Sequence, residues 1–159
     1  MRKKLVLISL AIILVLLSSL IVFRAKGLNS KQDLVKRVLK IAVVSGEISD
    51  YNLIEDKENL ILSSENFDTS LVPKFDGIKF TILSPEEIKE KANKEGDFLY
   101  LKFNEINIKD GSASISLDNT WAAADTSKAV YASGGGFTIT FHKRFGTWVE
   151  DKTRKAWIS

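Results

Sequence analysis

Cysteine is absent from this chain of 159 residues. Its absence excludes disulfide bonds, thiol nucleophiles and cysteine-ligated metal sites. Residues 28–159 are nevertheless long enough to bury well over half of the surface that the unfolded chain exposes. A hydrophobic core alone is therefore sufficient to hold this segment together, and oxidising conditions neither help nor harm it.

Histidine is almost as scarce: His142 is the only histidine in the chain. A histidine-based metal site would have no second ligand of its type, and no serine lies in a nucleophile-elbow motif. Alternation along the surrounding segment places His142 on a polar strand face, beside Lys143 and Arg144. We therefore expect no bound metal, no cofactor and no catalytic role for His142.

Acidic residues are missing before Asp33, and a long apolar run occupies that region. The run from Leu5 to Phe23 comprises nineteen uncharged residues, sixteen of them apolar, and it follows three basic residues at 2–4. A helix of this length approaches the ~30 Å of a bilayer's hydrocarbon core. Because the preceding residues are basic, the N-terminus is expected in the cytoplasm. We predict a single-pass signal-anchor in residues 1–27, with residues 28–159 outside the cytoplasm.

A cleaved signal peptide is the alternative to an anchor, and it would make the domain a secreted one. Such peptides have an apolar core of about 7–15 residues and end in small residues at a cleavage site. The run here is longer, and the one passable small-residue triplet, at 25–27, contains Lys26. Either alternative places residues 28–159 outside the cytoplasm.

The formal net charge of +3 belongs to the full chain and does not describe the domain at residues 28–159. Residues 1–26 hold five of the 23 basic side chains and none of the 20 acidic ones, so the remainder has 18 basic and 20 acidic residues, a net of −2. This balance gives no support for nucleic-acid binding or for electrostatic docking of the domain to anionic lipid.

Two helices and two short strands are predicted in the first part of the domain. Apolar residues at three-to-four spacing predict an amphipathic helix that opens at Ser30 and stops at Gly46. Residues 59–62 and 78–83 are typical of short strands. The sequence at 84–87 combines an N-cap, a proline at the first helical position and a glutamate at N3, which predicts a helix to Asn93 that ends at Gly96.

From Asp97 onward the apolar pattern has period two, which is typical of strands. A hairpin turn is expected at Asp110-Gly111. Further strands are predicted at 112–118, 130–143, 147–150 and 157–158. The fold class is therefore α+β: a curved antiparallel meander with helices packed on one face, after the N-terminal transmembrane helix.

Glycines and tryptophans provide two candidate sites in the second half of the chain. The glycines at 134–136 lack the helix that a phosphate cradle requires, so they indicate a β-bulge or sharp bend, with close ligand approach as the alternative. Trp148 and Trp157 are expected to close the core. Trp121 is assigned to core packing, with ligand stacking at a pocket mouth as the alternative.

Three acids, Asp97, Glu105 and Asp118, lie on or beside the long strands. A carboxyl group on the inner side of the sheet would have a raised pKa, which suits proton abstraction. By alternation Glu105 shares the side of Leu99 and Leu101, so it is the candidate catalytic acid. The preferred alternative is a solvated carboxylate near the end of the strand, which a bulge there would turn outward.

The pattern of a helix before a meander resembles the NTF2-like, or cystatin-like, superfamily. The motifs that carry the resemblance are a glycine-interrupted strand at 135–141, then 146–148 and 157–159. Members of this superfamily include isomerases and dehydratases that use a residue in a cone-shaped cavity, and non-catalytic domains that bind partners, some on a single membrane helix. No catalytic residue of the family maps onto this chain.

The expected function is a membrane-anchored extracytoplasmic domain that binds a small ligand or an envelope protein, or forms a homodimer, without being an enzyme. Tyr100, Trp121 and Tyr131 are the candidate ligand-binding residues. The alternative is a small lyase or isomerase in which Glu105 acts as the acid and the two tyrosines donate hydrogen bonds.

Overall fold

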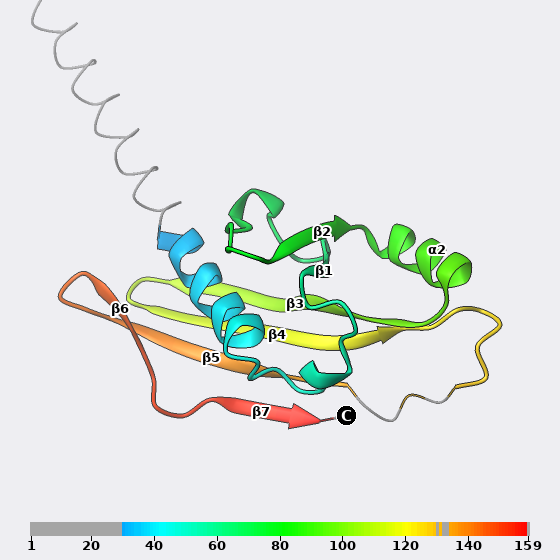
Figure 1. Ribbon diagram of the computed structural model, residues 1–159. Coiled ribbons are helices and arrows are strands. Elements are labelled where there is room, and N and C mark those ends of the chain that lie inside the picture. Colours follow the sequence, from blue (N-terminus) through cyan, green and yellow to red (C-terminus); the bar gives the residue numbers. More distant parts are fainter. Residues whose placement is uncertain (1–29, 130, 132–133, 159) are drawn as a thin grey trace, which may run out of the picture.

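The computed structural model describes residues 30–129, 131 and 134–158 (Figure 1). The predicted signal-anchor therefore lies outside the described residues. Within them, no helix combines the length and the apolar character needed to cross a membrane.

The helix predicted between Ser30 and Gly46 is confirmed. Residues 30–39 are α-helical and continue directly into a π-helical turn, η1, at Lys40–Val44. The chain then turns at Gly46, which has φ +66° and lies under the ring of Tyr51. The apolar stripe of this helix is fully buried, as its spacing predicts. Its buried residues are Leu34, Val35, Val38, Leu39, Ala42 and Val43.

Seven strands form one curved sheet with the order β2-β1-β3-β4-β5-β6, and β7 also pairs with β5. Both β6 and β7 lie on the side of β5 away from β4, one after the other along that strand. The strands are β1 (Asn59–Ser63), β2 (Lys79–Leu83), β3 (Phe98–Lys109), β4 (Ser112–Ala122), β5 (Gly135–Arg144), β6 (Thr147–Glu150) and β7 (Lys155–Ile158).

The predicted antiparallel meander holds only from β3 onward. There β3, β4, β5 and β6 pair in chain order and each pair is antiparallel, although twelve residues, 123–134, connect β4 to β5. By contrast, β1 runs parallel to both of its neighbours, β2 and β3. Residues 64–78, which include the short 3₁₀ helix η3 (Thr69–Leu71), carry the chain back so that β2 starts at the same end as β1. Strand direction depends on this return path, which the period-two pattern does not encode.

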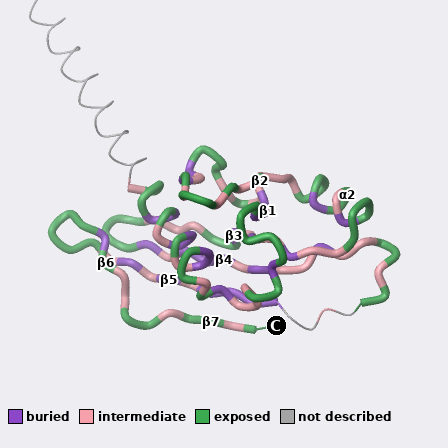
Figure 2. The backbone as a smooth tube through the Cα atoms, viewed as in Figure 1, coloured by how far each residue is buried: buried purple, intermediate pink, exposed green. Residues whose placement is uncertain are grey.

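The first helix covers one face of the sheet and forms the main core with it. Side chains alternate between the faces along each strand, and buried residues of β1, β3, β4 and β5 belong to one core with this helix. Figure 2 shows buried positions along these strands and the helix. The largest of these strand residues that are fully buried are Leu60, Leu62, Leu101, Phe103, Ile115, Leu117, Ile139 and Phe141.

The second helix, α2 (Pro85–Glu95), packs against the opposite face, so the prediction of helices on one face is wrong. Its buried residues Ile88 and Ala92 form a separate cluster with Ala122. Partly buried side chains around this cluster include Tyr100, whose neighbours in β3, Leu99 and Leu101, belong to the main core. The predicted capping box of α2 is confirmed, with both reciprocal hydrogen bonds present at its N-terminus.

The glycines of β5 do not form a bulge. The pairing of β5 with β4 runs without interruption from Gly135 to His142. A Cβ on Gly135 would collide with the carbonyl oxygen of Trp157, and one on Gly136 with the Asp118 carboxylate. The predicted bulge or bend is therefore replaced by a regular strand in which glycine is required because protein groups approach the backbone closely.

Candidate functional site

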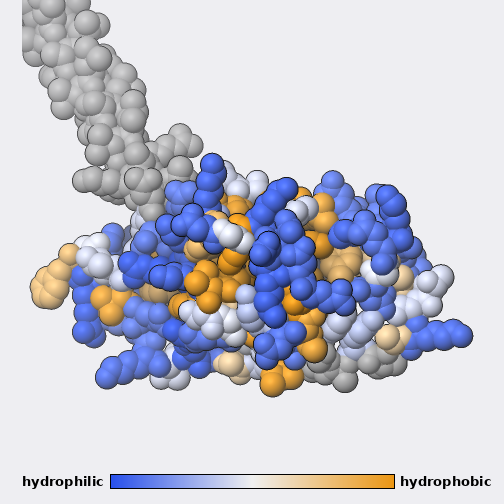
Figure 3. Space-filling model, viewed as in Figure 1, coloured by the Kyte–Doolittle hydropathy of each residue, from blue (hydrophilic) through white to orange (hydrophobic). Residues whose placement is uncertain are grey.

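The candidate site is a cleft that opens between β1 and β3. These two strands share a single register pair, Leu62 with Leu101. Before that pair they diverge, and the space between them has a volume of about 590 Å³. The C-terminal end of α2, residues 53–56, part of β2 and Trp121 of β4 complete its walls. In the same view as Figure 1, apolar side chains reach the surface between charged ones (Figure 3).

Aromatic rings form much of the cleft wall. Phe98 and Tyr100 lie edge to face, with ring centroids 6.4 Å apart, and Trp121 also lines the cleft. The ring of Tyr131 stacks on Trp121 with centroids 4.1 Å apart and planes inclined by 11°. Tyr100 and Trp121 both line the cleft, but from opposite faces of the sheet, because Trp121 packs with the main core and Tyr100 with the α2 cluster. Tyr131 lies against Trp121.

Asp97 holds the segment after β4 against the start of β3. Its carboxylate accepts hydrogen bonds from the Ala124 backbone N–H (2.6 Å), the Ser127 hydroxyl and the Tyr131 hydroxyl. The bonds from Ser127 and Tyr131 are the largest causes of a pKa for Asp97 below its usual range. The hydrogen bond between the Tyr131 hydroxyl and Asp97 also raises the pKa of Tyr131. Asp97 is therefore ionised and holds this segment in place, and its lowered pKa makes it poorly suited to act as a general base.

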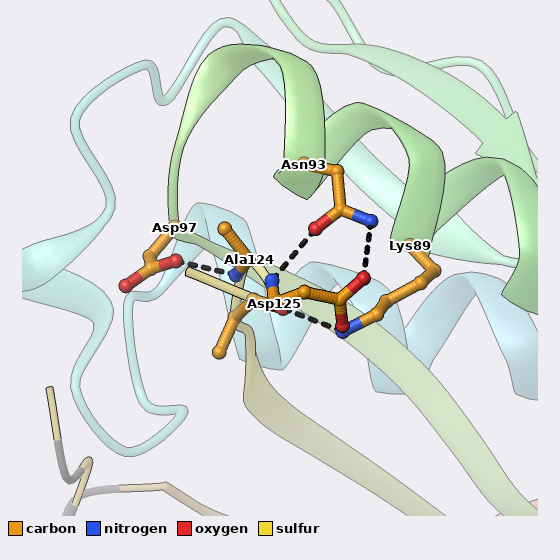
Figure 4. Close-up of polar contacts among 6 residues, drawn as sticks. Lys89, Asn93, Asp97, Ala124 and Asp125 are labelled. Atoms are coloured by element: carbon orange, nitrogen blue, oxygen red, sulfur yellow. Dashed lines mark hydrogen bonds and ion pairs between the residues drawn. The ribbon is translucent and has the colours of Figure 1, made fainter. Parts of the chain in front are cut away.

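A second set of bonds fastens the same segment to α2 (Figure 4). The Asp125 backbone N–H donates to the Asn93 side chain (2.7 Å), whose amide donates back to the Asp125 carboxylate (2.9 Å). The Lys89 ammonium lies 2.5 Å from that carboxylate and is the main cause of its lowered pKa. Together with Asp97, these contacts fix the wall of the cleft on two sides.

The rim of the cleft is acidic. Four carboxylates line it, from Glu55, Asp56, Glu95 and Asp97, against the single ammonium of Lys91. That ammonium pairs with Glu95 and lies 5.7 Å from the centre of the Phe98 ring. An aromatic wall with an excess of negative charge suits an apolar group that carries a positive charge.

Glu105 does not belong to this cleft. An irregularity in register between Phe103 and Glu105 leaves Asn104 unpaired in β3, and beyond it the strand faces exchange. Glu105 is consequently exposed and pairs with Ser116, away from the main core. The predicted buried position is wrong, and the alternative of an outward-turned, solvated carboxylate is confirmed.

The remaining polar candidates also lie outside the cleft. His142 Nδ1 is 2.6 Å from the Asp151 carboxylate, on the sheet face opposite the main core. Asp118 accepts a hydrogen bond from Asn104 at 2.5 Å, and burial raises its pKa. Within the described part of the chain, no three histidine or acidic side chains are grouped as a metal site requires.

Sequence reasoning missed the contributions of Phe98 and of residues 53–56. Phe98 has no sequence signal beyond its place in the alternating pattern after Asp97, and residues 53–56 carry no recognisable motif. Their role arises because β1 diverges from β3. In comparisons with protein-family models, with curated proteins and with solved structures, nothing matches this chain.

Proposed function

We propose that this protein is a membrane-anchored extracytoplasmic binding domain, and that its ligand occupies the cleft between β1 and β3. The observation that carries this proposal is the aromatic lining of the cleft, with Phe98 and Tyr100 on one side and Trp121 on the other. Trp121 is stacked on Tyr131, which Asp97 holds in place. The apolar run from Leu5 to Phe23 supports the membrane anchor.

The dimensions and chemistry of the cleft support binding of a small molecule or a single side chain of a partner. Small-molecule sites have volumes of about 300–1,000 Å³, with apolar walls and few polar groups. Burial raises the pKa of Tyr100, so its hydroxyl stays protonated and can donate a hydrogen bond. The excess of carboxylates at the rim favours ligands with an amine or another cationic group.

The geometry favours binding over the lyase or isomerase alternative. Glu105, the acid on which that alternative depends, is exposed and outside the cleft. Asp97 lines the cleft, but its lowered pKa and its three donors make it a weak base. We therefore assign no catalytic role to a residue of the cleft.

The test uses two ligands with the same ring and opposite charge, tryptamine and indole-3-acetate. Each is titrated into the full chain in lipid nanodiscs, and the indole N–H resonances of the three tryptophans are followed by NMR. Trp121 lines the cleft, whereas Trp148 and Trp157 lie elsewhere and serve as internal controls.

We expect tryptamine to shift the Trp121 resonance in a saturable way, with a weaker response to indole-3-acetate. The resonances of Trp148 and Trp157 should stay in place. Equal shifts of all three resonances, or no shift of Trp121 at any concentration of either ligand, would contradict the proposal. A Trp121 response that does not depend on ligand charge would contradict the role of the acidic rim.

A further inference from the structure

The turn between β5 and β6 presents an aromatic ring to solvent. Phe145 and Gly146 form a two-residue hairpin loop, and Phe145 is fully exposed (107%). Apolar atoms appear at the extreme left of Figure 3, where Figure 1 places this turn. The ring therefore contributes nothing to the core of the domain.

The backbone of this turn does not favour phenylalanine either. Phe145 has φ +48° and Gly146 has φ +81°, the left-handed conformation at both positions. Two-residue hairpin loops of this kind prefer Asn, Asp or Gly, because a larger side chain is strained there. Neither burial nor backbone preference accounts for Phe145, which points to a contact outside the domain.

Basic side chains surround the turn, although the domain as a whole is slightly acidic. Lys143 and Arg144 immediately precede Phe145. The Lys143 backbone N–H donates to the Gly111 carbonyl oxygen at 2.8 Å, so the β3–β4 turn, which follows Lys109, lies beside it. Asp110 is the one acidic residue among residues 109–111 and 143–147. Net charge averaged over the domain conceals this local excess of positive charge.

The turn lies at the end of the domain where the described chain begins. Trp148, three residues after Phe145, donates from its indole N–H to the Ser30 hydroxyl. The Arg37 guanidinium also donates to the Trp148 carbonyl oxygen at 2.9 Å. Figure 1 shows the β5–β6 turn and the start of the first helix at the same end of the molecule.

The length of chain before Ser30 limits how far this end can be from a membrane. Six residues, 24–29, separate Ser30 from Phe23, the last residue of the apolar run. Six residues span roughly 20 Å at most, even when fully extended. If residues 5–23 cross a bilayer, the end of the domain that carries Ser30 lies close to the surface of that bilayer.

We propose that the β5–β6 turn rests on the bilayer that holds the anchor. Phe145 enters the headgroup region, and Lys109, Lys143 and Arg144 lie against lipid phosphates. Aromatic side chains are favoured at this depth, and basic side chains near an anionic surface add attraction. This inference rests on the membrane anchoring proposed above, and it fixes how the domain is oriented on the membrane.

The absence of cysteine allows the contact to be measured with single labels. Thr147→Cys, just beyond the turn and exposed, carries a fluorophore sensitive to polarity while Phe145 stays in place. Lys94→Cys, exposed on α2, is the matched control at the other end of the domain (Figure 1). Both labelled full chains are reconstituted into phosphatidylcholine vesicles that contain a minority of phosphatidylglycerol, with or without nitroxide-labelled lipid.

We expect the label at 147 to emit at shorter wavelength than the label at 94, and to be quenched at least twofold more strongly by the nitroxide lipid. Phe145→Asn in the Thr147→Cys background should remove most of this difference. A label at 147 that is as accessible to water as the label at 94 overturns the inference, and so does quenching that Phe145→Asn leaves intact. If Phe145 instead contacts a protein partner, the label at 147 would be as accessible to water as the label at 94 in these vesicles.

Flotation of the same vesicles after an alkaline wash separates failure of the inference from failure of the anchor. A chain that floats but shows a water-accessible label at 147 retains its anchor and lacks the contact. A chain that is lost in the wash contradicts the anchor itself, and the contact with it.

Discussion

Tyr131 makes two contacts at once: its ring stacks on Trp121 at 4.1 Å, and its hydroxyl donates to the Asp97 carboxylate. Trp121 comes from the end of β4, and Asp97 directly precedes β3. One side chain therefore links the aromatic wall of the cleft to the anchor of the segment that follows β4. The two contacts differ in chemistry, so substitutions can separate them.

Tyr131→Phe keeps the stacked ring and loses the hydroxyl bond, whereas Tyr131→Ala loses both. Stacked aromatic pairs contribute about 0.5–1.5 kcal/mol beyond the area they bury. We expect Tyr131→Ala to weaken tryptamine binding roughly two- to tenfold, and Tyr131→Phe to weaken it less. NMR titration of the Trp121 indole N–H provides the measurement. If Phe and Ala at position 131 had equal effects, the stack would not contribute to the site.

Acid should release the segment that Asp97 holds. Because hydrogen bonds lower the pKa of Asp97 in the folded protein, its stabilising contribution is complete above the ordinary pKa of about 3.9. This contribution is lost as the pH falls through the lower, folded-state pKa. The Ala124 amide resonance should titrate with that lower value. In Asp97→Asn the titration should be absent, and its persistence there would assign it to another group.

Asp118 should show the opposite dependence, since burial raises its pKa. The ionised form is then disfavoured by folding, so the free energy of unfolding increases as the pH falls from above the folded pKa towards the ordinary value of about 3.9. Asp118→Asn keeps an acceptor for Asn104 and stays neutral. We expect it to be at least as stable as the native chain at pH 7, with a flatter pH dependence in chemical denaturation. A clear loss of stability at pH 7 would contradict the assignment.

Gly136→Ala should destabilise the domain by about 1–3 kcal/mol, because the added methyl group meets the Asp118 carboxylate and the Leu117 carbonyl oxygen. Thr138→Ala, one pleat further along the same face of β5, is the control and should cost less. Adding Asp118→Ala to Gly136→Ala should recover part of the loss in urea denaturation. Additive effects of the two substitutions would show that the contact with the Asp118 carboxylate is not the cause.

Phe145→Asn should stabilise the folded domain while it removes the proposed membrane contact. Asparagine tolerates the left-handed conformation that phenylalanine adopts at a cost of about 1–2 kcal/mol, so a gain of about 0.5–1 kcal/mol is expected. Phe145→Ala lacks this preference and should not produce the same gain. Thermal denaturation of the native chain, Phe145→Asn and Phe145→Ala is the measurement. A melting temperature for Phe145→Asn below that of the native chain would contradict the strain argument.

Local pattern predicted most elements of the fold, because local physics forms them. The capping box at Ser84 and Glu87 fixed the start of α2, and the period-two pattern after Asp97 identified the long strands. Pattern alone did not determine strand direction or which face each helix covers. Phe98 and Tyr100 lie on the outer face of β3 and pack around α2, a contact that depends on tertiary structure.

The candidate site was predictable only in its parts. Tyr100, Trp121 and Tyr131 are predicted as ligand-binding residues, and in the structure Tyr100 and Trp121 line the cleft while Tyr131 stacks on Trp121. The cleft itself results from the divergence of β1 from β3, which has no sequence signature. Glu105 shows the limit of alternation, because one unpaired residue at Asn104 reversed the face of every residue after it in β3.

The single pairing of Leu62 with Leu101 also has a mechanical consequence. Because few backbone hydrogen bonds join β1 to β3, the ribbon of β1 and β2 is held to the rest of the sheet mainly by side chains in the core, among them the buried Leu60 and Leu62. A ligand in the cleft would contact both β1 and β3 and restrain their movement relative to each other. Amide hydrogen exchange in β1 would therefore slow when a ligand binds.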